Sequence, residues 1–278
     1  MNSVILDGRK YAAQWLSDYT KKLNGATAVL AVIVVGSDPA SAWYVQKKQQ
    51  TAEKFGIKTQ VYPLPDTVSQ NEVATHIQAL NSDPEITGIL LQLPLPHLLE
   101  SSRNALLNTI APHKDVDGLG AYQQGLLVQN NSAAIVSATV RGIIELLTQY
   151  QVSVRSKQVV VIGASQLVGL PLSILLTNAG ATVTICHKYT TRLPDHTLQA
   201  DILISATGVP HLITKNHIKP GAIVIDVGTS VIDGKLSGDV DFHEVSLIAS
   251  MITPVPGGVG PMTIAALIAN LVDLRLRN

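Results

Sequence analysis

Several residue types are scarce in this chain, and each shortage excludes a class of protein. Cys186 is the single cysteine among 278 residues, which excludes an internal disulfide and fits a reducing compartment, so we expect a cytoplasmic protein. Only 4% of the residues are aromatic although 46% are hydrophobic, so we predict an aliphatic core, as in α/β proteins with buried parallel strands. The formal net charge is zero, which argues against a general nucleic-acid-binding surface.

Signals for targeting and for membranes are also scarce. The first ten residues, MNSVILDGRK, contain neither a long apolar stretch nor a pattern rich in arginine and serine. We read no apolar run as long enough to cross a bilayer, so no membrane partner is expected.

Strand-like and helix-like stretches alternate along the chain. The predicted strands are apolar runs of strand length at residues 28–35, 58–62, 86–92, 158–162, 181–186, 201–205, 222–227 and 246–251. Helices are predicted at residues 38–55, 98–107, 142–149, 166–178 and 260–276. A further helix is predicted to begin after Ser69, where the sequence matches a capping box. Residues 109–133 look loop-like and indicate a boundary. This alternation predicts two α/β domains with parallel sheets.

Two positions in the first half suit proton chemistry. Tyr44 and Lys48 are four residues apart on a predicted helix, so they share one face. Apolar neighbours suggest that this face is partly buried, and burial lowers a lysine pKa toward values useful for moving protons. Gln92 ends a buried strand, at the edge where open α/β sheets bind ligands, although a plain strand-end amide is the alternative.

Two further segments are unusual in composition. Lys114-Asp115-Val116-Asp117-Gly118 places two aspartates beside a glycine, a pattern typical of a turn or of a metal site. Other oxygen ligands at fixed spacing are missing nearby, so we predict no metal. Residues 253–263 contain three glycines and three prolines, which indicates a rigid loop that can approach a flat ligand closely.

Together with Gln92-Leu93-Pro94-Leu95-Pro96 and the segment from Tyr44 to Lys48, this glycine–proline loop resembles the bifunctional 5,10-methylenetetrahydrofolate dehydrogenase/cyclohydrolase family. The resemblance extends from Leu6 through the C-terminal helix. It implies an N-terminal α/β folate domain, residues 1–139, on which the helix 260–278 packs. It also implies a Rossmann-like NADP-binding domain with a parallel sheet, residues 140–259, and a cleft where folate meets nicotinamide.

The resemblance also implies the site residues. Lys48, Gln92, Tyr44 and Asp117 match the catalytic positions, with Lys48 handling protons and Asp117 accepting two N–H donors from the pterin edge. The matching substrate-binding positions are Tyr44, Gln92, Leu93, Asp117, Pro256, Gly257, Gly260 and Pro261. The expected partners are one-carbon derivatives of tetrahydrofolate and a second copy of the chain in a homodimer.

The cofactor site is predicted from a strand, a glycine-bearing loop and a helix in sequence. The usual dinucleotide fingerprint is not matched, because Ser165 replaces the second glycine and Gly169 comes one residue late. The loop does resemble that of the family. No acidic residue lies between Ala181 and Leu193, and the basic cluster there favours NADP over NAD. The predicted cofactor-binding residues are Gly163, Ala164, Ser165, Val168, His187, Lys188 and Thr229.

The chain departs from the family pattern at four places. The family commonly has other residues at 137–140, after Gly228, at Ala164 and at Gln123. None of these departures removes a matching catalytic residue. Two other functions stay open at this point, an NADP oxidoreductase for a substrate other than folate and a catalytically silent folate- or nucleotide-binding protein.

Overall fold

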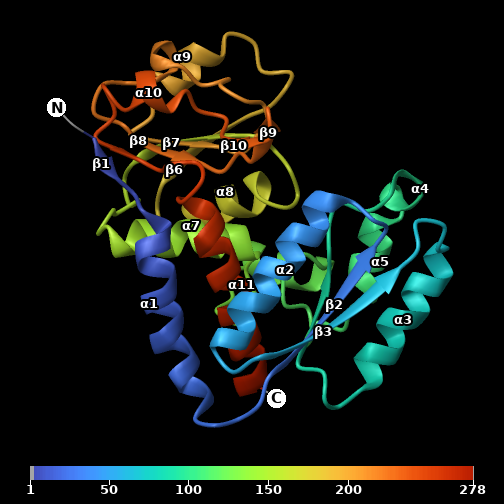
Figure 1. The fold of residues 1–278 in the computed structure, drawn as a ribbon. Helices are drawn as coiled ribbons and strands as arrows, with labels where there is room; N and C mark the ends of the chain where they lie inside the picture. The colour runs from blue at the N-terminus through green and yellow to red at the C-terminus, as the bar shows by residue number, and fades with distance from the viewer. Residues whose placement is uncertain (1–2, 278) are drawn as a thin grey trace. The chain divides into compact units, whose positions relative to one another are not determined.

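A computed structural model describes residues 3–277, and the chain divides into two compact units, each with its own sheet (Figure 1). The six-stranded unit contains the N-terminal segment up to Ala13 and residues Thr139–Thr263. The three-stranded unit contains Gln14–Ala138 and the segment from Ile264 onward. Two helices, α1 (Gly8–Thr20) and α11 (Val259–Arg277), continue from one unit into the other. The predicted α/β fold with parallel sheets is confirmed.

The sheet of the six-stranded unit is parallel throughout, as the short apolar runs predict. In spatial order its strands are β1 (Val4–Ile5), β11 (Met251–Ile252), β8 (Ile223–Asp226), β7 (Ile202–Ser205), β5 (Gln158–Ile162) and β6 (Thr182–Cys186). The chain runs outward from β5 to β6 and then returns to the other side of β5 to form β7. This reversal creates a topological switch point, and ligands of open α/β sheets bind at the carboxyl ends of the strands there.

The pairing of β1 explains why the division differs from the predicted one. Residues 1–139 are predicted as one domain, but Val4 and Ile5 pair in parallel with Met251 and Ile252 of the six-stranded sheet. The N-terminal segment therefore belongs to that unit.

Short helices and a hairpin complete the six-stranded unit. The helices are α7 (Ala138–Gln149), α8 (Gly169–Asn178), α9 (Leu193–Thr197), η2 (Lys215–His217) and α10 (Phe242–Val245). The antiparallel hairpin consists of β9 (Ser230–Ile232) and β10 (Lys235–Ser237). Aliphatic side chains from β5, β7 and β8 form the main hydrophobic cluster, which Cys186 joins as a buried free thiol.

The three-stranded unit is built around β2 (Val29–Val35), which lies between β3 (Lys58–Leu64) and β4 (Gly88–Leu91), all parallel. Figure 1 shows α2 and α3 on opposite sides of this sheet, as right-handed crossovers in opposite directions require. Val73, Ile77 and Leu80 form the buried stripe of α3, at the spacing of one helix face. The helices are η1 (Lys21–Leu23), α2 (Pro39–Lys54), α3 (Gln70–Ser82), α4 (His97–Glu100), α5 (Arg103–Thr109) and α6 (Ala121–Val128).

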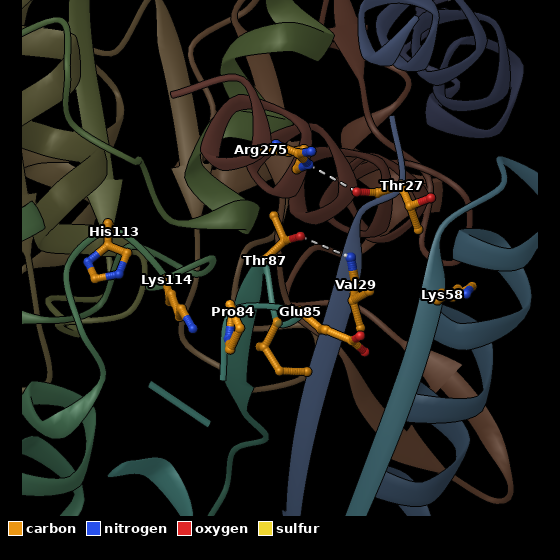
Figure 2. Close-up of a pocket in the computed structure, with 10 residues that line it drawn as sticks. Thr27, Val29, Lys58, Pro84, Glu85, Thr87, His113, Lys114 and Arg275 are labelled. Carbon is orange, nitrogen blue, oxygen red and sulfur yellow. Dashed lines mark hydrogen bonds between the residues drawn. The ribbon is translucent and has the colours of Figure 1, made fainter. Parts of the chain in front are cut away.

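A cavity of about 650 Å³ opens at the amino ends of β2, β3 and β4 (Figure 2). This end of the sheet is opposite to the end at which Gln92 follows β4. Its lining is more polar than apolar in character and includes Lys58, Lys114 and Arg275.

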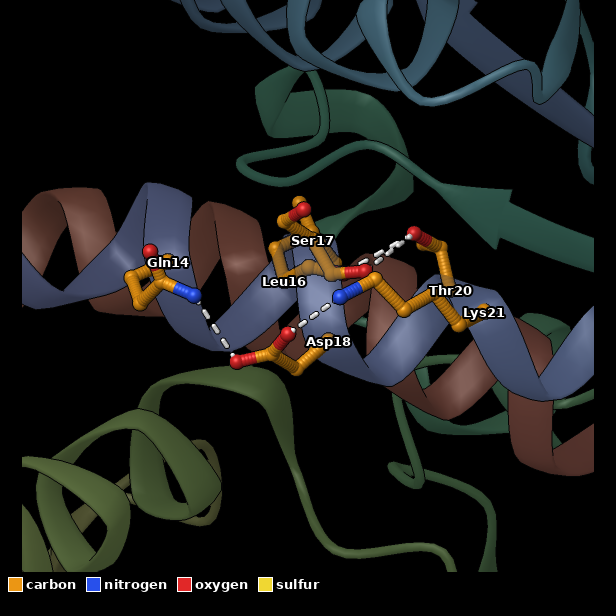
Figure 3. A network of polar contacts seen from close by, with 6 residues as sticks. All are labelled: Gln14, Leu16, Ser17, Asp18, Thr20 and Lys21. Carbon is orange, nitrogen blue, oxygen red and sulfur yellow. Dashed lines mark hydrogen bonds and ion pairs between the residues drawn. The ribbon is translucent and has the colours of Figure 1, made fainter.

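Exposed polar contacts secure the end of α1 within the three-stranded unit (Figure 3). The Asp18 carboxylate accepts hydrogen bonds from Gln14 Nε2 at 2.9 Å and from Lys21 Nζ at 2.7 Å. The hydrogen bonds from Lys21 and Gln14 lower the pKa of Asp18. Thr20 Oγ1 donates to the Leu16 carbonyl at 2.9 Å. Such exposed pairs contribute little to the free energy of unfolding, so they mark the end of the helix but do not stabilise the fold appreciably.

One helix corrects the expectation that no apolar run could cross a bilayer. Among the described residues, α11 is long and apolar enough to do so, with a mean hydropathy of 1.4 over its most apolar window. However, 61% of that window is buried in the structure, as in the core helix of a folded domain.

Candidate functional site

The helix α2 begins with a defined cap that fixes where its side chains lie. Asp38 accepts a hydrogen bond from Ser41 N at 2.8 Å, and Pro39 occupies the first helical position, where it costs no hydrogen bond. Tyr44 and Lys48 follow at a separation of one turn, and both side chains are half-buried. The predicted shared face is therefore present.

Lys48 and Gln92 are brought together across the three-stranded unit. Lys48 Nζ donates a hydrogen bond to Gln92 Oε1 at 2.9 Å. Gln92 directly follows β4 and is 8% exposed, and its Nε2 donates to the Leu93 carbonyl at 2.5 Å. Both ends of the amide are engaged, so its oxygen is held toward the lysine. Leu93 also packs against the hydrophobic core of the unit.

Burial and charge act in opposite directions on Lys48 and Asp117. Burial lowers the pKa of the Lys48 ammonium, and the nearby Asp117 charge opposes this effect. Burial raises the pKa of Asp117, opposed by the Lys48 charge and by the Ala138 N–H. Ala138 N lies 3.3 Å from Asp117 Oδ1. Because desolvation brings an amine pKa closer to neutrality, this arrangement can exchange a proton.

The two neighbouring aspartates differ in their surroundings. Asp115 is 2% exposed and accepts hydrogen bonds from Gly118 N at 2.9 Å and Gly120 N at 2.8 Å, which close the loop. Burial raises the pKa of Asp115 to about 6. Asp117 is half-buried and lies close enough to Lys48 to affect its pKa. Asp115 therefore holds the loop that presents Asp117.

Three buried polar side chains around this loop were not singled out from the sequence for this role. Asn270 of α11 is fully buried, and its Nδ2 donates to the carbonyls of Val116 at 2.9 Å and Val136 at 2.8 Å. Gln123 Nε2 donates to the Pro112 carbonyl at 2.7 Å, and Gln123 Oε1 accepts from Ile135 N at 2.8 Å.

The third is Lys114, whose Nζ donates to the carbonyls of Leu80 at 3.0 Å and Asp83 at 2.6 Å, at the C-terminus of α3. This position suits a cation, because the last carbonyls of a helix lack partners. Of these three residues, only Asn270 stood out in the sequence, as a single asparagine within the apolar run of α11.

The predicted cofactor loop follows β5 at the switch point of the six-stranded sheet. Gly163 has a φ of 110°, and its N–H donates to the Cys186 carbonyl at 2.8 Å. A Cβ at Gly163 would overlap the Ala206 carbonyl oxygen, and one at Gly169 would overlap the Gly163 carbonyl. Gly169 therefore lets α8 pass directly over the loop. The helix α8 begins at Gly169, three residues later than predicted, because residues 166–168 form a turn.

The other predicted cofactor residues lie at the same edge of this sheet, since parallel strands end together. His187 and Lys188 follow β6, and both are exposed. Thr229 follows Gly228 after β8 and is also exposed. Arg192 instead pairs with Asp195 at 3.1 Å on the surface. The residues Ala164, Ser165 and Val168 belong to the turn before α8, where Val168 N donates to Ser165 Oγ at 3.1 Å.

A buried carboxylate network supports this edge. Asp226 at the end of β8 accepts hydrogen bonds from the N–H groups of Gly228, Asp239 and Val240, and burial raises its pKa to about 6. Asp239 is fully buried, and its Oδ2 accepts from Ser205 Oγ at 2.9 Å and Thr207 N at 2.6 Å. The segment from Gly238 to Val240 thus connects the ends of β7 and β8.

The glycine–proline loop lies in the six-stranded unit. The Gly257 carbonyl accepts from Arg9 N at 3.1 Å, and Gly258 N donates to the Pro254 carbonyl at 2.8 Å. Pro256 and Gly260 are exposed and Pro261 is half-buried. The loop residues therefore belong to a different unit from Lys48, Gln92 and Asp117. Among residues 3–277, no group of three or more His, Cys, Asp or Glu side chains is placed to hold a metal ion.

Comparison with known proteins gives matches over almost the whole chain. Residues 6–117 match the model of the tetrahydrofolate dehydrogenase/cyclohydrolase catalytic domain, and residues 137–278 match the NAD(P)-binding domain of the same family. The bifunctional protein FolD of Aquifex aeolicus is 46% identical over 274 residues, covering 96% of this chain and 94% of that protein.

Two solved structures are similar in both sequence and fold. The bifunctional enzyme FolD from Campylobacter jejuni has 41% identity and a TM-score of 0.95, with 99% of this chain and all of that chain covered. The Trypanosoma brucei enzyme, complexed with NADP and an inhibitor, has 35% identity and a TM-score of 0.93, with 100% of this chain and 98% of that chain covered. The chain therefore belongs to the tetrahydrofolate dehydrogenase/cyclohydrolase family.

Proposed function

We propose that this protein is a bifunctional enzyme of one-carbon metabolism. It oxidises 5,10-methylenetetrahydrofolate to 5,10-methenyltetrahydrofolate with NADP, and it hydrolyses the methenyl compound to 10-formyltetrahydrofolate. The hydrogen bond between Lys48 and Gln92, with Asp117 beside the lysine, is the observation that carries this proposal in a chain of this family. Membership of the family makes an oxidoreductase for another substrate the weaker explanation.

The catalytic residues proposed for the folate chemistry belong to the three-stranded unit. Asp117 accepts the two adjacent N–H donors of the pterin edge, Tyr44 lies against the ring system, and Lys48 with Gln92 faces the one-carbon unit. Leu93, as the neighbour of Gln92, contributes an apolar contact. The residues Pro256, Gly257, Gly260 and Pro261 of the glycine–proline loop remain proposed substrate-binding residues.

In the hydrolysis, water adds to the methenyl carbon between the two folate nitrogens. Lys48, as the free amine, takes one proton from the attacking water. The hydroxyl that is formed then loses its proton as its oxygen becomes the formyl C=O, the bond from this carbon to N5 breaks, and N5 receives that proton, so the formyl group remains on N10. The net reaction releases one proton. Burial lowers the pKa of Lys48 and so favours the free amine that this role requires, and Gln92 fixes the direction of the amine.

The NADP roles belong to the six-stranded unit. The loop at Gly163 suits a dinucleotide, because Gly163 and Gly169 lack the Cβ atoms that would overlap neighbouring carbonyls, and the loop leads into the N-terminus of α8. Ala164, Ser165 and Val168 would line the phosphates, Lys188 with His187 would meet the 2′-phosphate, and Thr229 would lie beside the nicotinamide. Bound NADP supplies the hydride acceptor; the chain aligns the two reactants.

The proposal includes a cytoplasmic homodimer. The single cysteine is buried and free, which suits a reducing compartment. The hairpin of β9 and β10 exposes Val231 (65%) and Ile232 (41%), and a second copy could cover these side chains. Sedimentation equilibrium measures the mass directly, and a monomer at micromolar concentration would remove the dimer from the proposal.

The function is tested by one coupled assay. Purified protein is mixed with methylenetetrahydrofolate and either NADP or NAD, reduced cofactor is recorded, and decay of the methenyl compound is then followed. We expect both steps, with NADP preferred. A protein that binds folate but gives neither reduced cofactor nor methenyl decay would be a silent binding protein.

A further inference from the structure

The cavity at the amino ends of β2, β3 and β4 is unrelated to the proposed catalytic groups, which follow the carboxyl end of β4. Its volume of about 650 Å³ is in the range of small-ligand pockets. All of its lining residues belong to the three-stranded unit. The cavity is therefore a separate feature that the folate and NADP chemistry does not explain.

Cations outnumber acids in the lining. Lys58, Lys114 and Arg275 carry positive charge, and Glu85 is the single acidic lining residue. His113 also lines the cavity. The chain as a whole has zero net charge, so a concentration of three cations against one acid in a single cavity is a local feature.

The cations come from different sides of the cavity (Figure 2). Lys58 begins β3 and pairs in register with Val29 of β2. Lys114 precedes the residue that bridges to Ile89 of β4. Since β2 lies between β3 and β4, these two lysines flank the amino end of β2 from opposite sides. Arg275 reaches the cavity from α11, where its Nε donates to the Thr27 carbonyl at 3.0 Å.

Lys114 is a buried member of these three cations. Lys114 is 5% exposed, and two of its three N–H donors are used by the carbonyls of Leu80 and Asp83. Burial lowers the pKa of Lys114, with opposition from the Asp83 charge. An anion in the cavity would favour the charged form of this lysine. The fork of Arg275 has further N–H donors beyond Nε, in a geometry that matches phosphate and carboxylate.

We propose that this cavity binds a small ligand with two oxyanion groups, phosphoryl or carboxylate, one beside Lys58 and the other between Lys114 and Arg275. The hydroxyl of Thr87, whose oxygen accepts from Val29 N at 3.1 Å, adds a neutral donor on the cavity floor. Glu85 disfavours a third anionic group and can accept a hydroxyl or N–H of the ligand.

Calorimetric titration with inorganic pyrophosphate tests the proposal. The titration is done at low ionic strength with NADP at saturation, so that the predicted dinucleotide site is filled. We expect one pyrophosphate per chain. Lys58→Gln should weaken binding about tenfold or more, because one charge-assisted hydrogen bond is lost. Lys58 makes no side-chain hydrogen bond or ion pair within residues 3–277, so its replacement should leave the fold intact.

The matched control is Lys54→Gln, which removes an exposed lysine of α2 that does not line the cavity and should bind as the parent does. Arg275→Lys keeps the charge but loses the fork, and should weaken binding less than Arg275→Gln. If citrate displaces pyrophosphate, the cavity accepts both carboxylate and phosphoryl groups. If citrate does not displace it, the cavity is specific for phosphoryl groups. No saturable heat in the parent, or equal affinity in the parent and Lys58→Gln, would overturn the proposal, whatever the catalytic assays show.

Discussion

At the scale of single residues, two aspartates two positions apart have different environments. Asp115 has its oxygens engaged by the N–H groups of its own loop, whereas Asp117 lies near Lys48 and influences its pKa. The local residue pattern could not separate them, because both fit a turn, and only the family resemblance singled out Asp117. Their difference arises from the path of the loop past β4, where Ile89 N donates to the Lys114 carbonyl at 2.7 Å.

Asp117→Ala should weaken folate binding and both activities together. The pterin edge would lose its paired acceptor, at a cost on the order of 1–3 kcal/mol for each unsatisfied group. Calorimetry of folate binding measures this loss. Asp18→Ala, at an exposed position of α1, should bind folate as the parent does. Unchanged affinity in Asp117→Ala would remove this residue from the site.

Lys188→Ala should raise the Michaelis constant for NADP sharply and leave that for NAD nearly unchanged. The exposed Lys188 follows β6, where a 2′-phosphate is expected, and Ala164 offers no charge in the preceding loop. Added salt should weaken NADP binding more in the parent than in the variant. The control is Lys157→Ala, an exposed lysine of the same unit. Equal losses for both cofactors would assign Lys188 a structural role.

At the scale of elements, α11 has a role in the site that its apolar sequence conceals. Its buried Asn270 donates to the carbonyls of Val116 and Val136, and so connects the segment that leads into Asp117 with the segment that leads into Ala138. The part of this helix that was predicted only to pack on the folate domain thus positions the loop that carries Asp117.

Asn270→Ala should lower the melting temperature and raise the Michaelis constant for folate. Two carbonyls would lose their donor, at about 1–3 kcal/mol for a buried group left unsatisfied. Thermal unfolding and initial-rate kinetics measure the two effects. Asn104→Ala, at an exposed position of α5, is the matched control. A variant that is destabilised but has an unchanged Michaelis constant would limit Asn270 to a role in stability.

The buried strands could be predicted from their apolar runs, whereas helix α1 and several short elements could not. The strand at 158–162 matches the prediction residue for residue, because a continuous apolar run is bounded by polar residues. The predicted strand at 246–251 is instead largely a turn that ends in the two-residue β11, and residues 109–133 contain α6. The two residues of β1 form a strand only through their pairing with β11, which is information from the distant end of the chain.

At the scale of the whole molecule, the groups proposed for hydrolysis and those proposed for NADP binding belong to different units. Lys48, Gln92 and Asp117 share the three-stranded unit, whereas the Gly163 loop and the Asp226–Asp239 network share the six-stranded unit. Local periodicity could not predict this division at residue 13, since it depends on the pairing of β1. The division does allow the two activities to be separated by mutation.

Asp239→Ala should raise the Michaelis constant for NADP and retain hydrolysis of methenyltetrahydrofolate. The change removes the acceptor of Ser205 and Thr207 at the cofactor edge, at about 1–3 kcal/mol per donor left unsatisfied. Both rates are measured on the same preparation. Asp233→Ala in the exposed hairpin should change neither. Loss of both activities in parallel would point to global unfolding in place of a local effect.

The most direct test of the account is the hydrolysis of methenyltetrahydrofolate, without NADP, by the parent, Lys48→Met and Lys47→Met. Methionine keeps the bulk of the lysine stem but cannot carry a proton, and Lys47 is the exposed neighbour on the same helix. Removing a positioned acid–base group typically costs about 10²–10⁴-fold in rate. We predict such a loss for Lys48→Met with folate binding largely preserved, and a parental rate for Lys47→Met. Hydrolysis by Lys48→Met at the parental rate would contradict the assignment of Lys48 as the proton carrier.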